Sequence, residues 1–475
     1  MSLEFNLISS DKYCTYITDG THGTHINQES GKYLLSAKDI LDGVVHIKEN
    51  SRVISEEDFN KIHKNYKLEN YDVLLTVAGT IGRTAIIRNY KNNYTFQRSV
   101  AIFKTNDKLK SLWLYYYLNS PIGKQIVKSL SKGTTQLILP LKDLRNLEIP
   151  VPKNIEDQKK ILSILVNIDK KIEVNKKINK NLEEQLLRIF DSWFLKFELS
   201  NEFSDSKLGL IPKGWKIDYL GSKKSCSIIK SGIDEFDNSK IYIATADVDN
   251  SIITSNDTLI TMDDKPSRAN MQPISNSIWF AKMIDSKKLI MVDEYCNDLL
   301  NNYIFSTGFC GLKCVDKYFY YLWTFLLTDV FDVMKNNFCT GTTMQAINNK
   351  DTKLIEFVLP DDKTITQFNS IAKPMFKKIY YNNLEIKKLQ RLRDTLLPKL
   401  MSGEINVSEV NCDLKIIIRK IYIKSSKLFL WRYLSENKNY IKNTKSNETL
   451  LKSRTIYKIN KFLAKFNARY RYYRQ

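Results

Sequence analysis

The sequence predicts an α/β (α+β) fold in which two globular domains are separated by two long helices that form an antiparallel coiled coil. Three observations lead to this prediction. The chain of 475 residues is too long for a single core. Segments about 207 residues apart resemble one another, which indicates a pseudo-twofold internal repeat. Two long charged segments carry apolar residues at heptad spacing, as paired helices do.

The composition excludes several classes of protein. With 43% hydrophobic and 26% charged residues, the chain fits a folded protein rather than a disordered one. Its seven cysteines are scattered and never form a CxxC pair, which favours a reducing compartment. The longest apolar run is interrupted by Asp329 and Asp332 and is too short to span a bilayer. With no secretory signal at the amino terminus either, we expect a cytoplasmic protein and no membrane partner.

The charge is concentrated at the carboxyl end. Residues 411–475 contain 17 Lys or Arg and three acidic residues, a net +14, which leaves +7 of the total +21 for residues 1–410. A basic balance favours a polyanionic partner, either nucleic acid or an acidic membrane surface. For the basic tail 409–475 two explanations stay open: a nucleic-acid-binding arm, or an altered reading frame or added segment past the normal terminus.

A short motif occurs twice, as GTTQ at 133–136 and GTTMQ at 341–345. Each copy is followed by a strand-like run that ends in proline, and then by a long helical pattern. Other segments of the first half also align with the second, and the first of these alignments sets Asp39 over Asp247. The aligned pairs are 34–45 with 242–253, 72–87 with 277–292, and 97–104 with 306–313. We therefore predict two domains on one scaffold, residues 1–152 and 199–360.

The segments 153–198 and 361–408 are predicted to be the two long helices. In the first, the apolar seam comprises Ile161, Leu165, Ile168, Ile172, Asn175, Asn179, Leu182, Leu186, Ile189 and Trp193. In the second, it comprises Phe368, Ala372, Met375, Ile379, Asn382, Ile386, Leu389, Arg393, Leu396 and Leu400. Antiparallel pairing is the simplest arrangement for two such helices in one chain. The alternative is two unrelated amphipathic helices, each packed on its own domain.

Single residues within these helices carry further expectations. Asn175 and Asn382 occupy equivalent positions, and a buried asparagine in an apolar seam fixes register at a cost in stability. Pro374 is expected to begin a new helical segment at its first turn, and Pro398 to end it.

Common catalytic motifs are missing from the sequence. It contains neither GxxxxGK[ST] nor GxGxxG, and no proline lies in the D/N/S-P-P-aromatic run of adenine methyltransferases. His22 and His25 are spaced as a possible metal pair, but loop histidines are the simpler interpretation. Cys310 and Cys314 are likewise better explained as core thiols than as zinc ligands.

One match to a nuclease motif is weak. Pro360-Asp361 followed by Glu385-Ile386-Lys387 fits the spacing of PD…ExK nucleases. That chemistry needs acids on adjacent strands to hold Mg²⁺, whereas Glu385 lies in the middle of a helical seam. We therefore expect no catalytic residue and no metal site.

A chain with these features resembles the specificity subunit of type I restriction–modification systems. The resemblance covers about residues 10–408 and rests on the order and doubling of its motifs. They are ITDGTHGT (17–24), LLSAKDILDG (34–43), VISEEDF (53–59), DVLLTVAGTIGRTAI (72–86), GTTQ (133–136), the segment 150–186, PKGW (212–215), PSRANMQP (266–273) and RDTLLPKLMSGEI (393–405).

The resemblance implies a chain that binds double-stranded DNA and catalyses nothing. Two target-recognition domains would each read one half of a split, asymmetric sequence. The helices would dock two methyltransferase subunits, and restriction/translocase subunits would bind in turn. The chain would hold no cofactor, since S-adenosylmethionine, ATP and Mg²⁺ belong to the partners.

DNA contact is expected at polar residues of the aligned loops, because phosphates give affinity and base edges give specificity. In the first domain the candidates are Thr80, Arg83, Thr84, Gln97, Arg98, Lys132, Thr134, Thr135 and Gln136. In the second they are Arg268, Asn270, Lys282, Ser286, Lys287, Lys288, Thr342, Thr343 and Gln345. For each one, a solvated turn residue is the simpler alternative.

Two other functions remain compatible with the sequence. A stand-alone DNA endonuclease would cut DNA with Mg²⁺ alone. A paired-domain scaffold would bind protein and show no salt-dependent affinity for duplex DNA.

Overall fold

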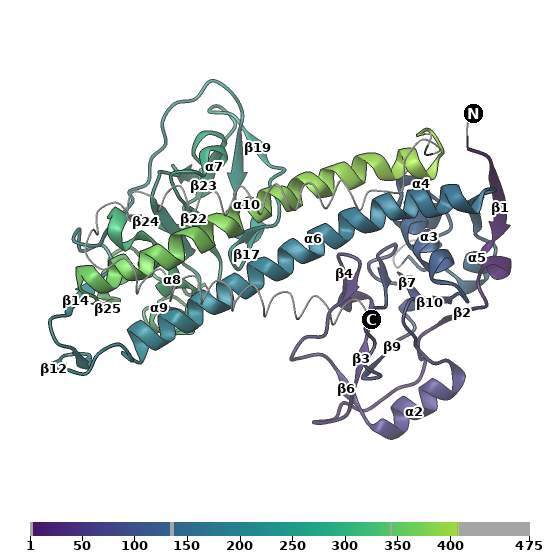
Figure 1. The fold of residues 1–475 in the computed structure, drawn as a ribbon, viewed down its shortest axis with the longest axis horizontal. Coiled ribbons are helices and arrows are strands. Elements are labelled where there is room, and N and C mark those ends of the chain that lie inside the picture. The colour runs from purple at the N-terminus through teal and green to yellow at the C-terminus, as the bar shows by residue number, and fades with distance from the viewer. Residues whose placement is uncertain (1–2, 134–136, 343, 406, 408–475) are drawn as a thin grey trace, which may run out of the picture. The chain divides into compact units, whose positions relative to one another are not determined.

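The computed structural model of the chain describes residues 3–133, 137–342, 344–405 and 407. They belong to two compact units (Figure 1). The first unit comprises the residues up to Val166 together with those from Thr395 onward, and the second comprises Asn167–Asp394. Each unit combines β-sheets with helices, so the predicted mixed α/β class is confirmed. Within the described ranges, no helix is both long and apolar enough to cross a membrane.

The first unit is built on an antiparallel sheet with strand order β2-β10-β7-β8, and α3 packs on β7 and β8. A smaller sheet, β6-β3-β9, contains one parallel pair, and β1 pairs with β11. The strands are β1 (Phe5–Ser9), β2 (Tyr16–Asp19), β3 (Lys32–Leu35), β4 (Ile40–Leu41), β5 (Val44–Val45), β6 (Val53–Ile54), β7 (Val73–Thr76), β8 (Thr84–Ile86), β9 (Tyr94–Phe96), β10 (Val100–Lys104) and β11 (Glu148–Pro152). The helices are α1 (Ser10–Tyr13), α2 (Glu56–Asn65), α3 (Lys108–Asn119), α4 (Pro121–Ser129) and α5 (Leu141–Arg145).

The second unit has the strand order β15-β24-β21-β22, with α8 packed on β21 and β22. Its second sheet, β19-β16-β23-β20, again contains one parallel pair, and β14 pairs with β25. The strands are β12 (Phe203–Ser206), β13 (Gly209–Pro212), β14 (Lys216–Tyr219), β15 (Cys226–Ile228), β16 (Lys240–Ile243), β17 (Val248–Asp249), β18 (Ile252–Ile253), β19 (Leu259–Ile260), β20 (Ala269–Met271), β21 (Ser277–Ala281), β22 (Leu289–Val292), β23 (Tyr303–Ser306), β24 (Phe309–Cys314) and β25 (Glu356–Leu359). The helices are α7 (Asn297–Asn302), α8 (Phe319–Leu327) and α9 (Asp329–Asn337).

The sequence explains why these strands form the cores. All four residues of β7 (VLLT) and all five of β21 (SIWFA) are buried, as expected for central strands covered on both faces. Asp39 and Asp247 accept hydrogen bonds at 2.8 Å from the backbone of Ser36 and Ala244, so the aligned aspartates stabilise the same type of short turn.

The long helices are α6 (Ile155–Phe190) and α10 (Asp362–Met401). Within the second unit they run antiparallel, because Asp169 contacts Arg393 while Asn179, ten residues later, contacts Asn382 (Figure 1). Within the first unit, Leu165 and Leu397 lie in one apolar core.

Of the predicted heptad positions of α6, Asn179 and Leu182 are only partly buried, and the buried stripe follows the heptads no further than Leu186. Beyond it, Phe190 and Phe194 are fully buried, whereas the predicted Ile189 and Trp193 are only partly buried. The shift begins at Phe190, the last residue of α6, before the π-helical turn Asp191–Leu195. Leu186, Phe190 and Phe194 are four residues apart, so they lie on one face and enter the aromatic core of the second unit.

The expectation for the two prolines in the second helix was wrong. Pro374 and Pro398 both lie inside the continuous helix α10 rather than at segment ends. Each removes one backbone hydrogen bond, a cost of about 3 kcal/mol in an unsupported helix. Apolar packing along the helix offsets this cost, since Ala372 and Leu400 are nearly inaccessible to solvent.

His63 of α2 gives the first unit a pH-dependent stability. Its ring lies 4.0 Å from the ring of Phe59, and burial, reinforced by Lys67 and Lys104, lowers its pKa from 6.5 to about 4. Between those two values the unfolded chain binds a proton that the folded chain does not, so stability is lost as the pH falls from 6.5 towards 4. We expect His63→Phe to reduce the acid-induced loss of unfolding free energy by about 1–2 kcal/mol, allowing for partial exposure.

The measurement is urea unfolding of both proteins at pH 7 and pH 4.5, read on peptides of α2 by hydrogen exchange. Comparison with wild type is essential because Asp72 has its pKa raised by burial to about 6, despite Lys104, and contributes the opposite slope. The exposed His46→Asn serves as control and should keep the wild-type profile. Parallel profiles for wild type and His63→Phe would contradict the prediction.

Candidate nucleic-acid interface

In the first unit, three loops converge at one end of the main sheet. They are the β7–β8 loop (77–83), the β9–β10 turn (97–99) and the turn that contains the first GTT motif, between Lys132 and Ile138. The backbone N–H of Val77 donates to the Ser99 carbonyl at 2.9 Å, and its carbonyl accepts from Leu139 at 2.9 Å. Lys132 and Ile138 exchange two backbone hydrogen bonds at 2.8 Å. The motif turn is therefore tied directly to the loop after β7.

The predicted residues of the first unit are distributed unevenly over this surface. Thr80, Arg98 and Lys132 are exposed, whereas Arg83 and Gln97 are partly exposed. Lys132 lies 2.6 Å from Asp143, so its charge is partly compensated. Four further candidates of the first unit are not in this accessible group: Thr84, Thr134, Thr135 and Gln136.

Thr84 does not lie on the surface. It is 3% exposed within β8, and all three residues of this strand are buried. Its side chain cannot reach a duplex, so we withdraw it from the contact set. Thr134, Thr135 and Gln136 fall outside the described residues.

The second unit repeats the same backbone contacts. The N–H of Lys282 donates to the Gly308 carbonyl at 3.0 Å, and its carbonyl accepts from Ile347 at 2.9 Å. Thr340 and Ala346 exchange hydrogen bonds at 3.2 and 3.1 Å. The β21–β22 loop (282–288), the β23–β24 turn and the second GTT turn thus meet as their counterparts do.

The lysines of the second unit are largely engaged with the protein. Lys282 Nζ donates to the Thr307 carbonyl at 3.1 Å, and Lys288 Nζ donates to the Thr245 carbonyl at 2.6 Å. Lys287 Nζ lies 2.8 Å from Asp329 and 3.4 Å from Asp332. These contacts order the lysine side chains and reduce the charge that they present to a phosphate.

The other predicted residues of the second unit are more accessible. Arg268, Thr342 and Gln345 are exposed, and Asn270 and Ser286 are partly exposed. The Ser286 carbonyl accepts from Lys335 Nζ at 2.9 Å. Thr343 lies outside the residues that the structure describes.

One segment near the first loops was missed by sequence reasoning. Thr21 pairs with the β9–β10 turn, because its N–H donates to Phe96 at 2.8 Å and its carbonyl accepts from Arg98 at 3.0 Å. The motif around it, THGTH, belongs to the family resemblance and fits a possible metal pair, but it is not among the predicted DNA contacts. Its two histidines have separate partners: His22 lies 2.9 Å from Asp19, and His25 lies 3.0 Å from the Thr21 hydroxyl.

A second candidate site lies between the two helices within the second unit. Asn175 and Asn382 are each 1% exposed, but they do not face each other. Asn175 donates to Glu385 at 2.8 Å, and Asn382 donates to Asn179 at 2.7 Å. A charged pair lies in the same interface, since Arg393 is 3.0 Å from Asp169. The helices therefore share a layer of hydrogen-bonded polar groups, in which Asn382 Oδ1 is buried without a partner among the described residues.

Comparison with known proteins identifies the family. The family model "Type I restriction modification DNA specificity domain" matches residues 24–184. The MjaIX specificity subunit of Methanocaldococcus jannaschii is 30% identical over 352 residues, which cover 71% of this chain and 78% of that protein. This chain belongs to the type I restriction enzyme specificity subunits.

Other members of the family are similar over different lengths. The HindI specificity subunit of Haemophilus influenzae is 22% identical over 68% of this chain and 84% of its own. The EcoBI specificity subunit of Escherichia coli is 32% identical over 28% of each chain. Among solved structures, the S subunit of M. genitalium aligns over 84% of this chain and 96% of its own, at 17% identity. Its TM-score of 0.47 is too low to support a shared domain arrangement.

As a type I specificity subunit, the chain is a non-catalytic DNA-recognition subunit rather than a stand-alone endonuclease. The geometry of the PD…ExK match agrees with this. Asp361 accepts from Trp215 at 3.2 Å, whereas Glu385 lies 24 residues further on, within α10. At 1.5 Å rise per residue the two acids are about 36 Å apart, too far to share an ion. Cys310 and Cys314 are core thiols, because both are buried in β24.

Proposed function

We propose that the specificity subunit reads an asymmetric, bipartite DNA target, one half with each unit. The observation that carries the proposal is the recurrence of the three-loop frame, with the same backbone contacts, in both units. The side chains on these frames differ, since TIGRT in the first loop corresponds to DSKKL in the second. A common frame with different side chains suits two readers of different base sequences.

The proposed domain boundaries follow the chain's elements. Target-recognition domains would comprise residues 1–152 and 199–360, and spacer helices 153–198 and 361–408. Strand β11 ends at Pro152 and β25 at Leu359, and a long helix starts within three residues of each, which supports these boundaries. The tail 409–475 lies outside the described residues, and its role is tested by truncation after Val410.

We propose that the doubled frame and the helices arose from one internal duplication, with α6 and α10 forming an antiparallel coiled coil. Equivalent strand orders and the buried pair Asn175 and Asn382 support this proposal. The asparagines would fix the register of the helices, since other registers would leave buried amides without partners.

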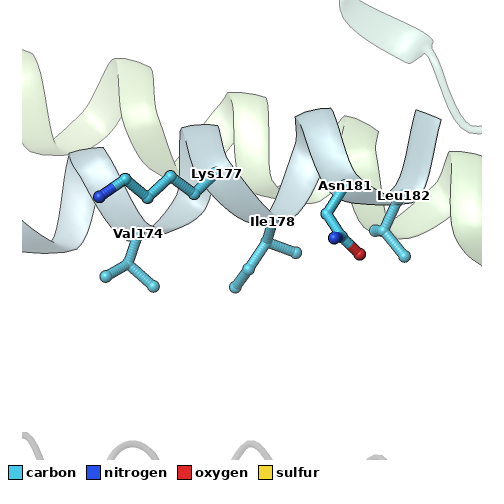
Figure 2. Close-up of a pocket in the computed structure, with 5 residues that line it drawn as sticks. All are labelled: Val174, Lys177, Ile178, Asn181 and Leu182. Carbon is cyan, nitrogen blue, oxygen red and sulfur yellow. The ribbon is translucent and has the colours of Figure 1, made fainter. Parts of the chain in front are cut away.

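The helices are also the proposed docking site for two methyltransferase subunits. On α6, Val174, Ile178 and Leu182 point away from α10 and line an open apolar groove, flanked by Lys177 and Asn181 (Figure 2). Leu182, a predicted seam residue, therefore contributes to this outer surface. An exposed apolar groove with a polar rim suits a protein partner. Restriction/translocase subunits would join the same cytoplasmic complex, and S-adenosylmethionine, ATP and Mg²⁺ would be bound by the partners.

The DNA contacts are proposed at the accessible residues of the loops and at Arg268 and Asn270 beside and within β20. They are Thr80, Arg83, Gln97, Arg98 and Lys132 in the first unit, and Arg268, Asn270, Lys282, Ser286, Lys287, Lys288, Thr342 and Gln345 in the second, with Thr134, Thr135, Gln136 and Thr343 retained from the sequence alone. The first test is to sequence methylated bases in cells with and without this subunit. A motif with two separated, unlike halves that vanishes on deletion supports the proposal. A motif that persists unchanged contradicts it.

Arg83 provides the sharpest single-residue test. Its guanidinium makes a weak 3.5 Å contact with the Ile40 carbonyl and is partly exposed, so it is available to DNA. We expect Arg83→Ala to weaken binding of the assembled complex about five- to tenfold, because a good base or phosphate contact contributes about 1–3 kcal/mol.

The effect should be confined to the first half of the motif. Binding is measured by fluorescence anisotropy at moderate salt, on duplexes altered in one half at a time. The exposed Lys91→Ala, outside the three loops, is the matched control and should bind like wild type. Unchanged affinity of Arg83→Ala would remove Arg83 from the contact set.

A further inference from the structure

The loops after β7 and β21 have equal lengths but different internal chemistry. Loop 77–83 contains two glycines with positive φ, Gly79 at +75° and Gly82 at +89°. Loop 282–288 contains no glycine, yet Asp285 has a φ of +51°. Residues other than glycine rarely adopt this conformation, although aspartate does so more readily than most. An interaction from outside the loop would stabilise this backbone conformation.

Helix α9 supplies that interaction through polar contacts. The Asn336 side chain donates to the Asp285 carboxylate at 2.9 Å and accepts from its backbone N–H at 3.2 Å. Lys335 Nζ donates to the carbonyl of the next residue, Ser286, at 2.9 Å. Lys287 is in turn paired with acids of α9. Three consecutive residues of the loop are thus attached to one short helix.

Lys335 is unusual because it is 1% exposed. Burial lowers its pKa, and Asp332, 3.7 Å away, opposes that shift. A buried cation is costly unless it is paired and hydrogen-bonded, so its contacts with Ser286 and Asp332 are the reason it is tolerated.

In the first unit, the corresponding loop 77–83 is supported by apolar packing instead of polar contacts. The equivalent helix, α4, carries Val127 at the position of Lys335, and Val127 is 2% exposed. Its methyl group would lie 3.7 Å from a Cβ added to Gly82. The first loop thus relies on glycines with positive φ and on packing against Val127. The second loop relies on hydrogen bonds from the buried Lys335 and from Asn336.

We propose that Lys335 and Asn336 are positioning residues for DNA reading by the second unit. They hold the backbone of residues 285 and 286 in one conformation and so fix the direction in which the loop presents Lys282, Ser286, Lys287 and Lys288. This inference rests on the proposed function of the loop. Because the cations themselves remain when the anchor is removed, general affinity for DNA should persist while base discrimination is lost.

The test uses the specificity subunit assembled with its methyltransferase partners. Lys335→Met removes the ammonium donor and keeps most of the apolar volume. Asn336→Asp sets two carboxylates against each other at the second anchor, and Asp285→Asn added to it restores a donor–acceptor pair. The neighbouring Asn337→Ala, exposed on the same helix, is the control. Binding is compared on the cognate duplex and on duplexes altered in one half.

We expect Lys335→Met and Asn336→Asp to reduce discrimination in the second half about tenfold or more, with discrimination in the first half unchanged. The double variant should recover most of the loss. A purely structural role would lower the melting temperature of the second unit without changing discrimination well below it, and that outcome overturns the inference.

The same experiment distinguishes a failure of the proposed function from a failure of this inference. If the wild-type complex discriminates neither half, the two-reader proposal is wrong. If wild type discriminates both halves and the variants do too, only the positioning role of Lys335 and Asn336 is wrong.

Discussion

Replacing Phe194 with alanine is expected to lower the unfolding free energy of the second unit by about 3–5 kcal/mol, the usual cost of deleting a buried aromatic ring. Phe194 is 2% exposed and lies at the end of the π-helical turn after α6. Its ring centroid is 4.9 Å from that of Tyr321 and 5.1 Å from that of Phe368. It therefore joins α6, α8 and α10 in one core, and its removal leaves a cavity among all three.

The measurement is urea titration followed by hydrogen exchange on peptides of α8, which reports on the second unit alone. The control is Phe203→Ala, which removes a phenylalanine that is 44% exposed on β12. We expect a loss below about 1 kcal/mol for the control, since most surface substitutions change stability little. Equal losses for the two variants would show that the aromatic cluster does not hold the helices to the sheet core.

Substitutions in the polar layer between α6 and α10 are expected to be strongly non-additive. Asn382→Leu removes the donor to Asn179 at a nearly inaccessible position. Leaving the side-chain oxygen Oδ1 of Asn179 unpaired should lower the unfolding free energy by about 1–3 kcal/mol. Asn179→Leu combined with Asn382→Leu replaces both partners by apolar groups, so the double variant should approach or exceed wild-type stability.

The cycle is completed with Asn179→Leu alone and measured by urea unfolding of all four proteins. A coupling energy of about 1–3 kcal/mol is expected for residues in direct contact. The exposed Asn181→Leu controls for the effect of leucine on helix stability and should change it by less than about 0.5 kcal/mol. Additive losses in the cycle would mean that the two asparagines do not interact.

The same double variant tests register. If the polar layer fixes the alignment of the helices, its removal should leave stability intact but weaken assembly with the methyltransferase subunits. Size-exclusion chromatography of the mixed subunits gives this readout. Full assembly by the double variant would assign the layer no role in register.

Much of the fold prediction depended on repeated sequence segments, because these can be recognised without knowledge of any tertiary contact. The mixed α/β class is confirmed, and the family assigned from ordered motifs such as ISEEDF and GTTQ is confirmed by comparison with known proteins. Heptad spacing also predicted the two long helices, since an amphipathic stripe is a local property of the chain.

Predictions for single residues depended on contacts that the sequence does not contain. Thr84 belongs to the same motif as Arg83 but points into the core of the first unit. Pro374 reads as the start of a helix, although tertiary packing carries α10 through it. The remaining DNA-contact residues stay predictions.

By itself, the sequence determined the mixed α/β class and the two long amphipathic helices, because periodicity is a local property of the chain, and it predicted that the two halves are related. Only the tertiary structure decided which groups meet. Asn382 pairs with Asn179 rather than with its equivalent Asn175, and a buried Lys335 supports one loop where Val127 supports the other. Such pairings join residues far apart in the chain, and their energies depend on burial and geometry that exist only once the chain has folded.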